Sequence, residues 1–470
     1  MSPSIVQLTP FLQPFPYGKN GLDSVAARFC LATEGSRAKI DRDGGIKPDQ
    51  PYGEAWFGTH ENGPAFVEGQ PGKSLKTLVR EDPEKWLGKK LLQDEQMRER
   101  YENDVPYLFK VLSFDKPLPL QCHPDKKLGQ QLKEQEFRRK GKNEDFVDEN
   151  AKPEVGVALS DYFTAFVGFR PPRQLAAIIK SVPEFASMFK SSTLAALDDI
   201  ASPPSQTVPE SEVNSVLRSL FSESISLPSS AVKPLIQKLS RRLELEGAAS
   251  VFAAANNFRA GGDANATGET EAEAMKRVWS IAVDNYGDED VGVLISACLM
   301  NLLRMKKGEG CWILADDLHA YVEGDIIECM ANSDNMVAHG LGTEEQGGVS
   351  TFVDMLSCRH LPASKLLLEY QEGSKLGAKG QTRHYKVPIA EFDLLTISLS
   401  PATATAESVA PLDGPLTFVV TEGAVTIRTE EGDSLTLTRG QAGFVAANSQ
   451  LAVETASNAE TAELWGAFYQ

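Results

Sequence analysis

Long apolar runs, paired cysteines and excess positive charge are all missing from this sequence. No apolar stretch approaches the roughly eighteen residues that a membrane-spanning helix needs. The six cysteines are scattered and form no CxxC pair, which is typical of reduced, buried thiols in a cytoplasmic protein rather than of a disulfide framework. Acidic residues outnumber basic ones by 65 to 47. The net charge of −18 therefore argues against nucleic acid or an anionic membrane as a partner.

The length and the ordinary apolar content indicate a soluble globular protein of two or three domains, because 470 residues exceed the usual size of a single core. The first residues lack a basic region followed by an apolar run, so no signal peptide is recognised. We expect a cytoplasmic protein that acts as a monomer.

Two kinds of pattern alternate along the chain. Residues 1–171 carry short apolar runs bounded by proline, aspartate and glycine, which predicts strands, with helices expected near 83–104 and 126–138. After about residue 305 strands return, and residues 416–440 alternate like an antiparallel barrel or jelly roll.

The middle of the chain has a different period. Val213, Val216, Leu217 and Leu220 recur at the spacing of one helix face. We therefore predict that 172–300 is mainly helical.

Two motifs carry side chains that could bind a metal. In the segment Gln121-Cys-His123-Pro, strand alternation puts Gln121 and His123 on one face. Glu154 follows about thirty residues later, and His319 supplies a second imidazole. Two imidazoles, a carboxylate and a neutral oxygen suit a divalent metal, zinc first, and the lack of a thiolate favours a catalytic over a structural site. On spacing alone, histidines so far apart are more often satisfied core residues.

The order of several longer motifs resembles that of one enzyme family. Their sequences are similar to the signature blocks of type I mannose-6-phosphate isomerases, and they are Glu54–Pro64, Tyr107–Ser113, Gln121–Lys126, Asn150–Glu154 and His319–Asn335. The resemblance extends from about Tyr17 nearly to the last residue. It implies a mainly β fold of cupin-type jelly rolls with a helical insertion domain.

The resemblance also implies a division into domains. One cupin-type domain would be assembled from 1–171 and 301–365, with the helical domain 172–300 inserted between them. Residues 366–470 would form a second, C-terminal cupin-like domain.

In this family the reaction interconverts mannose 6-phosphate and fructose 6-phosphate and feeds GDP-mannose synthesis. The resemblance implies one zinc ion per chain, with Gln121, His123, Glu154 and His319 as its ligands.

Aldose–ketose isomerisation moves a proton between C1 and C2, so it needs a base, an acid and a positive group. Candidate acid–base groups in the matched blocks are Glu328, Asp334 and Tyr321. Candidate substrate-binding groups are Lys126, Lys152 and Glu54. Each of these carboxylates could instead have a structural hydrogen-bonding role, and each lysine could be an ordinary surface residue.

Five positions depart from the family pattern. Ala338 stands where the family has a catalytic arginine, and Glu344 stands where it has a lysine. Pro119, Ala151 and Tyr17 replace a serine, a histidine and a tryptophan. Two further hypotheses follow: a catalytically impaired paralogue that binds zinc and a sugar, or an isomerase or epimerase for an uncharged or differently charged sugar.

Overall fold

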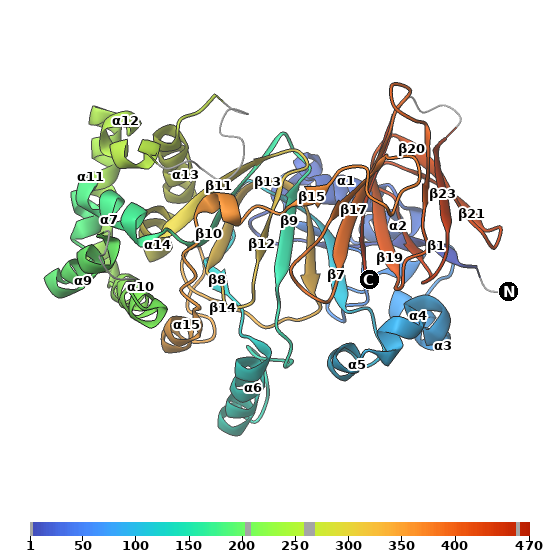
Figure 1. The fold of residues 1–470 in the computed structure, drawn as a ribbon, viewed down its shortest axis with the longest axis horizontal. Helices are drawn as coiled ribbons and strands as arrows, with labels where there is room; N and C mark the ends of the chain where they lie inside the picture. Colours follow the sequence, from blue (N-terminus) through green and yellow to red (C-terminus); the bar gives the residue numbers. More distant parts are fainter. Residues whose placement is uncertain (1–2, 203–207, 258–267, 457–460) are drawn as a thin grey trace.

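The computed structural model describes residues 3–202, 208–257, 268–456 and 461–470. It is mainly β, with the helices of 172–300 gathered at one end, the largest sheet in the middle and the C-terminal sheets at the other end (Figure 1). Within the described residues, no helix combines the length and the hydrophobicity that crossing a bilayer would require.

The central sheet positions the candidate site. Its strands are β2 (Phe11–Gln13), β5 (Glu54–Trp56), β7 (Tyr107–Phe114), β8 (Gln121–Cys122), β9 (Glu154–Ala158), β10 (Tyr162–Phe169), β11 (Met300–Lys306), β12 (Gly310–Ile313), β13 (His319–Ala331) and β14 (Val337–Ala338). The long strand β13 pairs with β8 and β10 through its first half and with β7 and β9 through its second half. It therefore joins two layers around one interior, which contains Phe163, Tyr321 and Ile326.

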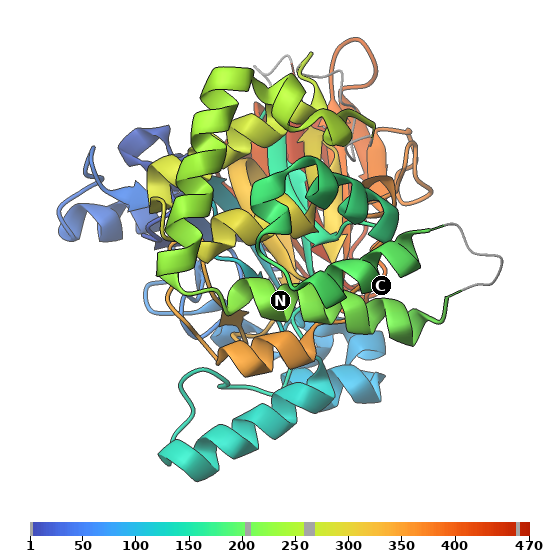
Figure 2. The ribbon, with the colours of Figure 1, turned by 90° about the vertical axis from the view of Figure 1, so that its left-hand side faces the viewer.

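Helices occupy most of the described part of 172–300 and cover one end of this sheet (Figure 2). They are α7 (Pro172–Ser181), α8 (Pro183–Ala186), α9 (Ser191–Ala201), α10 (Glu210–Ile225), α11 (Ser229–Glu246), α12 (Ala248–Val251), α13 (Glu271–Tyr286) and α14 (Val291–Leu299), with a 3-10 turn at Ala253–Asn257. Val213, Val216, Leu217 and Leu220 are all buried on α10, so the helix predicted from their spacing is confirmed.

The C-terminal strands form a second β unit. Its larger sheet contains β1 (Ile5–Thr9), β6 (Phe66–Val67), β15 (Tyr370–Gln371), β16 (Thr382–Tyr385), β17 (Asp393–Leu399), β19 (Leu416–Glu422), β22 (Ala442–Val445) and β24 (Ala462–Phe468). Its smaller sheet contains β18 (Ala406–Val409), β20 (Ala424–Thr429), β21 (Ser434–Thr438) and β23 (Leu451–Thr455). The antiparallel strands predicted over 416–440 are confirmed.

Strand β1, near the start of the chain, pairs with β22 in this C-terminal unit. One buried cluster includes Val6, Phe109, Val157 and Trp465, so the two β units share a core. The domain boundaries at 171, 300 and 365 therefore remain a prediction, because the shared core does not separate the two β units.

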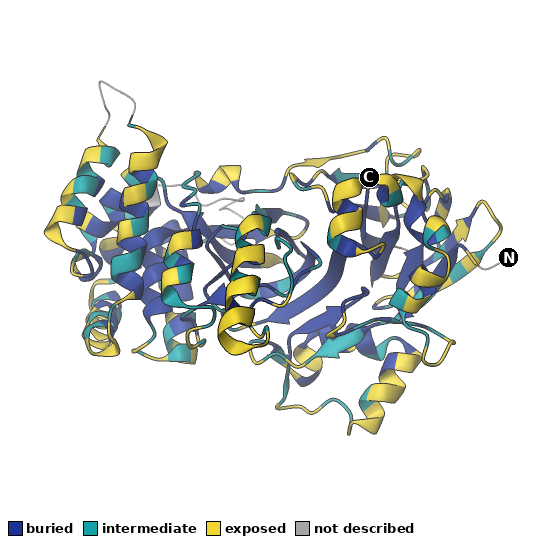
Figure 3. Cartoon of the chain, turned by 90° about the horizontal axis from the view of Figure 1, so that it is seen from below, coloured by how far each residue is buried: buried dark blue, intermediate teal, exposed yellow. Residues whose placement is uncertain are grey.

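Smaller elements surround the sheets. They are the paired strands β3 (Lys19–Asn20) and β4 (Pro51–Tyr52), the 3-10 turns at Gly21–Asp23 and Ala363–Lys365, and the helices α1 (Val25–Leu31), α2 (Glu34–Arg42), α3 (Leu75–Glu81), α4 (Pro83–Gln93), α5 (Glu95–Tyr101), α6 (Lys126–Lys140) and α15 (Val349–Met355). The helices expected near 83–104 and 126–138 are present. Helices α1 to α3 were not predicted. Most helices turn exposed residues outward, whereas the central strands are buried (Figure 3).

Candidate metal centre

Three strands bring the candidate ligands together. Gln121 lies on β8, His123 directly follows that strand, and Glu154 and His319 begin β9 and β13. Gln121 is the register partner of His319. Opposite residues of an antiparallel pair point to the same face, so these two side chains lie side by side.

Three of these side chains form a compact buried cluster. The potential ligand atoms of His123, Glu154 and His319 lie within 4.8 Å of one another. One carboxylate oxygen of Glu154 is 3.3 Å from Nε2 of His123, and the other is 3.4 Å from Nε2 of His319. All three residues are buried. The carboxylate thus lies between two imidazoles in a geometry that could hold one cation.

The two ring nitrogens of each histidine have different environments. Nδ1 of His123 is 2.8 Å from the carbonyl oxygen of Asn335, and Nδ1 of His319 is 2.9 Å from that of Asp317. A carbonyl only accepts, so each Nδ1 carries the proton and each Nε2 keeps its lone pair. Among the described residues, neither buried Nε2 has a hydrogen-bond partner. Lone pairs of this kind, directed at a carboxylate, fit a divalent metal.

The protonation states also suit metal binding. Burial, assisted by Lys152, lowers the pKa of His123 to about 4, which leaves the imidazole neutral at pH 7. Burial would raise the pKa of Glu154, but Lys152, with its amine 2.7 Å from the carboxylate, and the contacts with His123 and His319 together outweigh burial and hold that pKa well below the ordinary value. A metal ligand must be deprotonated, and both residues meet this requirement.

A second cluster of polar side chains, Lys110, Glu54 and Glu328, lies on β7, β5 and β13. The amine of Lys110 is 2.8 Å from Oε2 of Glu328 and 3.3 Å from Oε2 of Glu54. Glu54 also accepts hydrogen bonds from Tyr17 and, at 2.6 Å, from the indole of Trp56. Glu54 therefore has a partner on each oxygen and holds Lys110 in place.

Glu328 can exchange a proton near neutral pH. Burial raises its pKa to about 7, against the opposing effect of Lys110, and Glu154 and Glu54 add to the rise. Glu328 is the register partner of Lys110 on one side and of Gly156 on the other. A Cβ at Gly156 would lie 3.3 Å from the hydroxyl of Tyr321, so this glycine leaves room for the tyrosine.

An irregularity in β13 puts Glu328 in this group. His319 and Glu328 are an odd number of residues apart, so a regular strand would point them to opposite faces. The register against β10 shifts between Tyr321 and Glu323, which inserts one extra residue into β13. Glu328 then shares the interior face with Tyr321. The tyrosine hydroxyl is buried and, among the described residues, lacks a hydrogen-bond partner.

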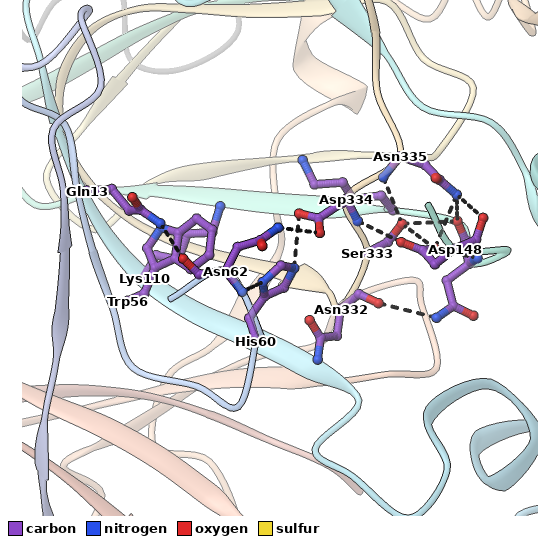
Figure 4. A network of polar contacts seen from close by, with 12 residues as sticks. Gln13, Trp56, His60, Asn62, Lys110, Asp148, Asn332, Ser333, Asp334 and Asn335 are labelled. Atoms are coloured by element: carbon purple, nitrogen blue, oxygen red, sulfur yellow. Dashed lines mark hydrogen bonds and ion pairs between the residues drawn. The ribbon is translucent and has the colours of Figure 1, made fainter. Parts of the chain in front are cut away.

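Asp334 lies beside His60 and Asn62 (Figure 4). Its carboxylate is 3.1 Å from Nε2 of His60 and accepts a 2.8 Å hydrogen bond from the amide of Asn62. Burial alone would raise its pKa, but the contact with His60 outweighs burial and keeps the pKa below its ordinary value. These residues line a cavity of about 390 Å³. Lys126, the first residue of α6, is half-buried.

The departures from the family pattern can also be placed. Ala338 is fully buried and is the register partner of Gln121 on the side away from His319. Its methyl group therefore lies on the ligand face and offers no hydrogen-bond donor. Continued strand alternation would direct His339, the next residue, to the opposite face, and Glu344 is exposed.

Sequence reasoning did not single out Lys110 or His60. Lys110 lies in the matched segment Tyr107–Ser113, and a lone lysine in an otherwise apolar strand is a signal that could have marked it. The backbone carbonyls of Asn335 and Asp317, which accept hydrogen bonds from the two histidines, could not be identified from the sequence, because every residue has a backbone carbonyl.

The sheets and the buried cluster define a cupin-type protein with a metal-binding centre. A family model described as "Phosphomannose isomerase type I, catalytic domain" matches residues 5–172. The mannose-6-phosphate isomerase of Ogataea parapolymorpha is 31% identical over 449 residues, which are 95% of this chain and 94% of that protein. That of Cryptococcus neoformans is 31% identical over 475 residues, 98% of each chain. The chain therefore belongs to the type I mannose-6-phosphate isomerases, a family of intramolecular oxidoreductases.

Solved structures show the same fold. The apo form of mannose 6-phosphate isomerase from Salmonella typhimurium matches with a TM-score of 0.71 and 21% identity over 100% of both chains. A mannose 6-phosphate isomerase bound with zinc and yttrium matches with a TM-score of 0.70 and 21% identity, also over 100% of both chains. The predicted fold class, mainly β with cupin-type jelly rolls and a helical insertion, is confirmed.

Proposed function

We propose that this protein is a zinc-dependent aldose–ketose isomerase that interconverts mannose 6-phosphate and fructose 6-phosphate and so feeds GDP-mannose synthesis. The observation that carries the proposal is the buried cluster of His123, Glu154 and His319, with both Nε2 lone pairs directed at one carboxylate. The curated relatives that cover nearly the whole chain are named for this reaction.

In this proposal His123, Glu154 and His319 hold one zinc ion, and Gln121 supplies a fourth, neutral oxygen from its position opposite His319. Bound zinc would act as a Lewis acid on the sugar oxygens during enediol formation. Lys152 keeps Glu154 ionised and presents a cation beside the ligand set.

The remaining side chains supply proton transfer and orientation. Glu328 is proposed as an acid–base group, because its raised pKa lets it both accept and donate a proton near pH 7. Lys110, hydrogen-bonded to it, stabilises its charged form. The hydroxyl of Tyr321 is available to a sugar oxygen, and Asp334 is a second candidate base. Lys126 and Glu54 are proposed to orient the substrate.

We further propose a cytoplasmic monomer without nucleic-acid or membrane partners. All six cysteines are buried and unpaired, which supports a reducing compartment. The net charge of −18 opposes binding to polyanions.

The alternative is a catalytically impaired or substrate-shifted paralogue that binds zinc and a sugar. A specific observation favours it: the fully buried Ala338 occupies the ligand face beside Gln121, where the family pattern has an arginine. An arginine offers a fork of donors to phosphate or enediolate, and alanine offers none.

One assay separates these readings. Purified protein is incubated with mannose 6-phosphate, and fructose 6-phosphate is followed through coupled dehydrogenation, before and after a chelator and after zinc is restored. Turnover that the chelator abolishes and zinc restores supports the isomerase. Stoichiometric zinc without turnover supports the impaired paralogue. Turnover of uncharged mannose, followed as free fructose in a parallel reaction, but not of its phosphate supports the shifted substrate.

A further inference from the structure

The two candidate histidine ligands are oriented by backbone carbonyls, and each carbonyl belongs to a segment held by one aspartate. His123 donates from Nδ1 to the carbonyl of Asn335, and His319 donates to the carbonyl of Asp317. Whatever fixes these two carbonyls fixes the direction of both Nε2 lone pairs. The contacts that fix them come from residues outside the ligand set.

The segment that carries the carbonyl of Asn335 is held by Asp148 (Figure 4). One carboxylate oxygen of Asp148 accepts hydrogen bonds from the hydroxyl of Ser333 at 2.8 Å and from the side-chain amide of Asn335 at 3.1 Å. The other oxygen accepts the backbone N–H of Asp334 at 2.8 Å. A single carboxylate therefore contacts three consecutive residues of the segment that carries the carbonyl.

The backbone at Asp317, which carries the second carbonyl, is anchored by the side chain of the same residue. This carboxylate, which is only 1% exposed, accepts the backbone N–H of Leu314 at 2.9 Å and the hydroxyl of Ser357 at 3.2 Å. It also forms an ion pair with Arg359, whose Nε is 3.0 Å away. The Arg359 guanidinium lies over the ring of Trp312, 4.2 Å from the centroid.

We propose that Asp148 and Asp317 are the positioning residues of the metal centre, each acting through one histidine: Asp148 through His123 and Asp317 through His319. The physical reason is that hydrogen bonds to each carboxylate fix the segment that carries the accepting carbonyl, and that carbonyl selects the tautomer with Nδ1 protonated and Nε2 free. This inference rests on the proposed zinc site but concerns residues that do not touch the metal.

The test measures zinc affinity in the absence of substrate. Asp148→Asn and Asp317→Asn should each weaken zinc binding by about 10-fold in competition with a chromogenic chelator, the lower end of the range found when a direct partner of a ligand is removed, because each aspartate acts through a carbonyl. Glu149→Gln and Asp316→Asn are matched neighbouring controls and should leave the affinity unchanged. An unchanged affinity in both test variants overturns the proposal.

A double-mutant cycle separates positioning from general structural damage. Asp148→Asn should have little further effect on zinc affinity when His123 is already alanine, and its full effect when His319 is alanine. Asp317→Asn should show the opposite pattern. Equal losses in both backgrounds would overturn the assignment of each aspartate to its own histidine.

Folding is checked on the metal-free protein by circular dichroism and thermal unfolding. Where an aspartate variant does not fold, Ser333→Ala or Ser357→Ala removes one hydrogen bond from the same carboxylate, and a smaller loss of affinity in the same cycle is then expected. Additive losses there would overturn the proposal. If the unsubstituted protein binds no zinc, the proposed metal site fails as well; normal zinc binding with unaffected variants contradicts only this inference.

Discussion

At the scale of single residues, the site has the side chains that a metal ion needs but lacks a positively charged side chain at position 338. His123, Glu154 and His319 are buried and close together, and the lowered pKa values of His123 and Glu154 leave the imidazole neutral and the carboxylate ionised. Ala338, on the same face beside Gln121, has no polar atom in its side chain. Metal binding and turnover can therefore be tested separately.

Removal of a ligand should weaken metal binding strongly. His123→Ala and His319→Ala each delete one of four proposed ligands and should weaken zinc binding by well over the roughly 10- to 100-fold that indirect changes cost. Elemental analysis after gel filtration gives the stoichiometry. His360→Ala is the control, because His360 is a partly exposed histidine whose Nδ1 lies 3.7 Å from Glu210, away from the cluster. Full zinc occupancy in both ligand variants would contradict the site.

Restoring charge should raise activity. Ala338→Arg combined with Glu344→Lys is expected to increase turnover of mannose 6-phosphate by about 30- to 1000-fold, because one charge-assisted contact is worth roughly 2–4 kcal/mol in a catalytic site. Zinc stoichiometry should not change. Ala338→Arg with Glu345→Lys, which moves the second charge by one residue, is the matched control.

The outcome that contradicts this prediction is an unsubstituted protein that is already as fast as a relative assayed beside it, and that the double substitution slows. Another residue would then supply the missing charge, and His339 and Lys126 would be tested first.

At the scale of elements, α6 lies in the segment that connects two candidate ligands, His123 and Glu154. It begins three residues after His123 and, with the turns that follow, returns the chain to Glu154 at the start of β9. The carboxylate of Glu136 holds the turn after α6 against the helix, since it accepts hydrogen bonds from the backbone N–H groups of Glu144, Asp145 and Phe146 at 3.0–3.2 Å.

The hydrogen bonds between Glu136 and this turn should be lost in acid. Burial would raise the pKa of Glu136, but hydrogen bonds from Lys140 and the three amides outweigh burial and lower it to about 2. A carboxyl whose pKa is lower in the folded state stabilises that state above its ordinary pKa, and this contribution is lost as the pH falls towards 2. NMR titration of amides 144–146 should report the loss. Glu136→Gln should open the turn at neutral pH, whereas Glu134→Gln, on the exposed side of α6, should not.

At the scale of the whole molecule, the beginning and the end of the chain form one sheet. β1 pairs with β22 over Ile5–Leu8, and the fully buried Leu8 packs in the core shared by the two β units. The N-terminal segment is therefore part of the C-terminal unit in space.

Shortening Leu8 should destabilise both β units. Leu8→Ala is expected to cost about 2–5 kcal/mol in unfolding free energy, the usual range for a buried leucine. Leu22→Ala, at a position that is 58% exposed, is the control and should change stability by less than about 0.5 kcal/mol. Urea unfolding gives the free energy, and hydrogen exchange should show faster opening in β19 and β22. Faster exchange confined to residues 1–171 would contradict a shared core.

Features set by local spacing were predictable from the sequence. The helical period in Val213–Leu220 and the alternation in 416–440 depend only on neighbouring residues, and both elements are present. The ligand motifs were recognisable because strand alternation and the family resemblance can both be recognised within short segments of sequence.

Features set by long-range pairing were decided only by the tertiary structure. The extra residue in β13, which turns Glu328 to the face of Tyr321, follows from its register against β10 and cannot be read from alternation. The place of β1 beside β22 joins residues more than four hundred positions apart. The choice of Nε2 as the free nitrogen of each histidine depends on carbonyls that every residue possesses, so only their position in space makes them specific.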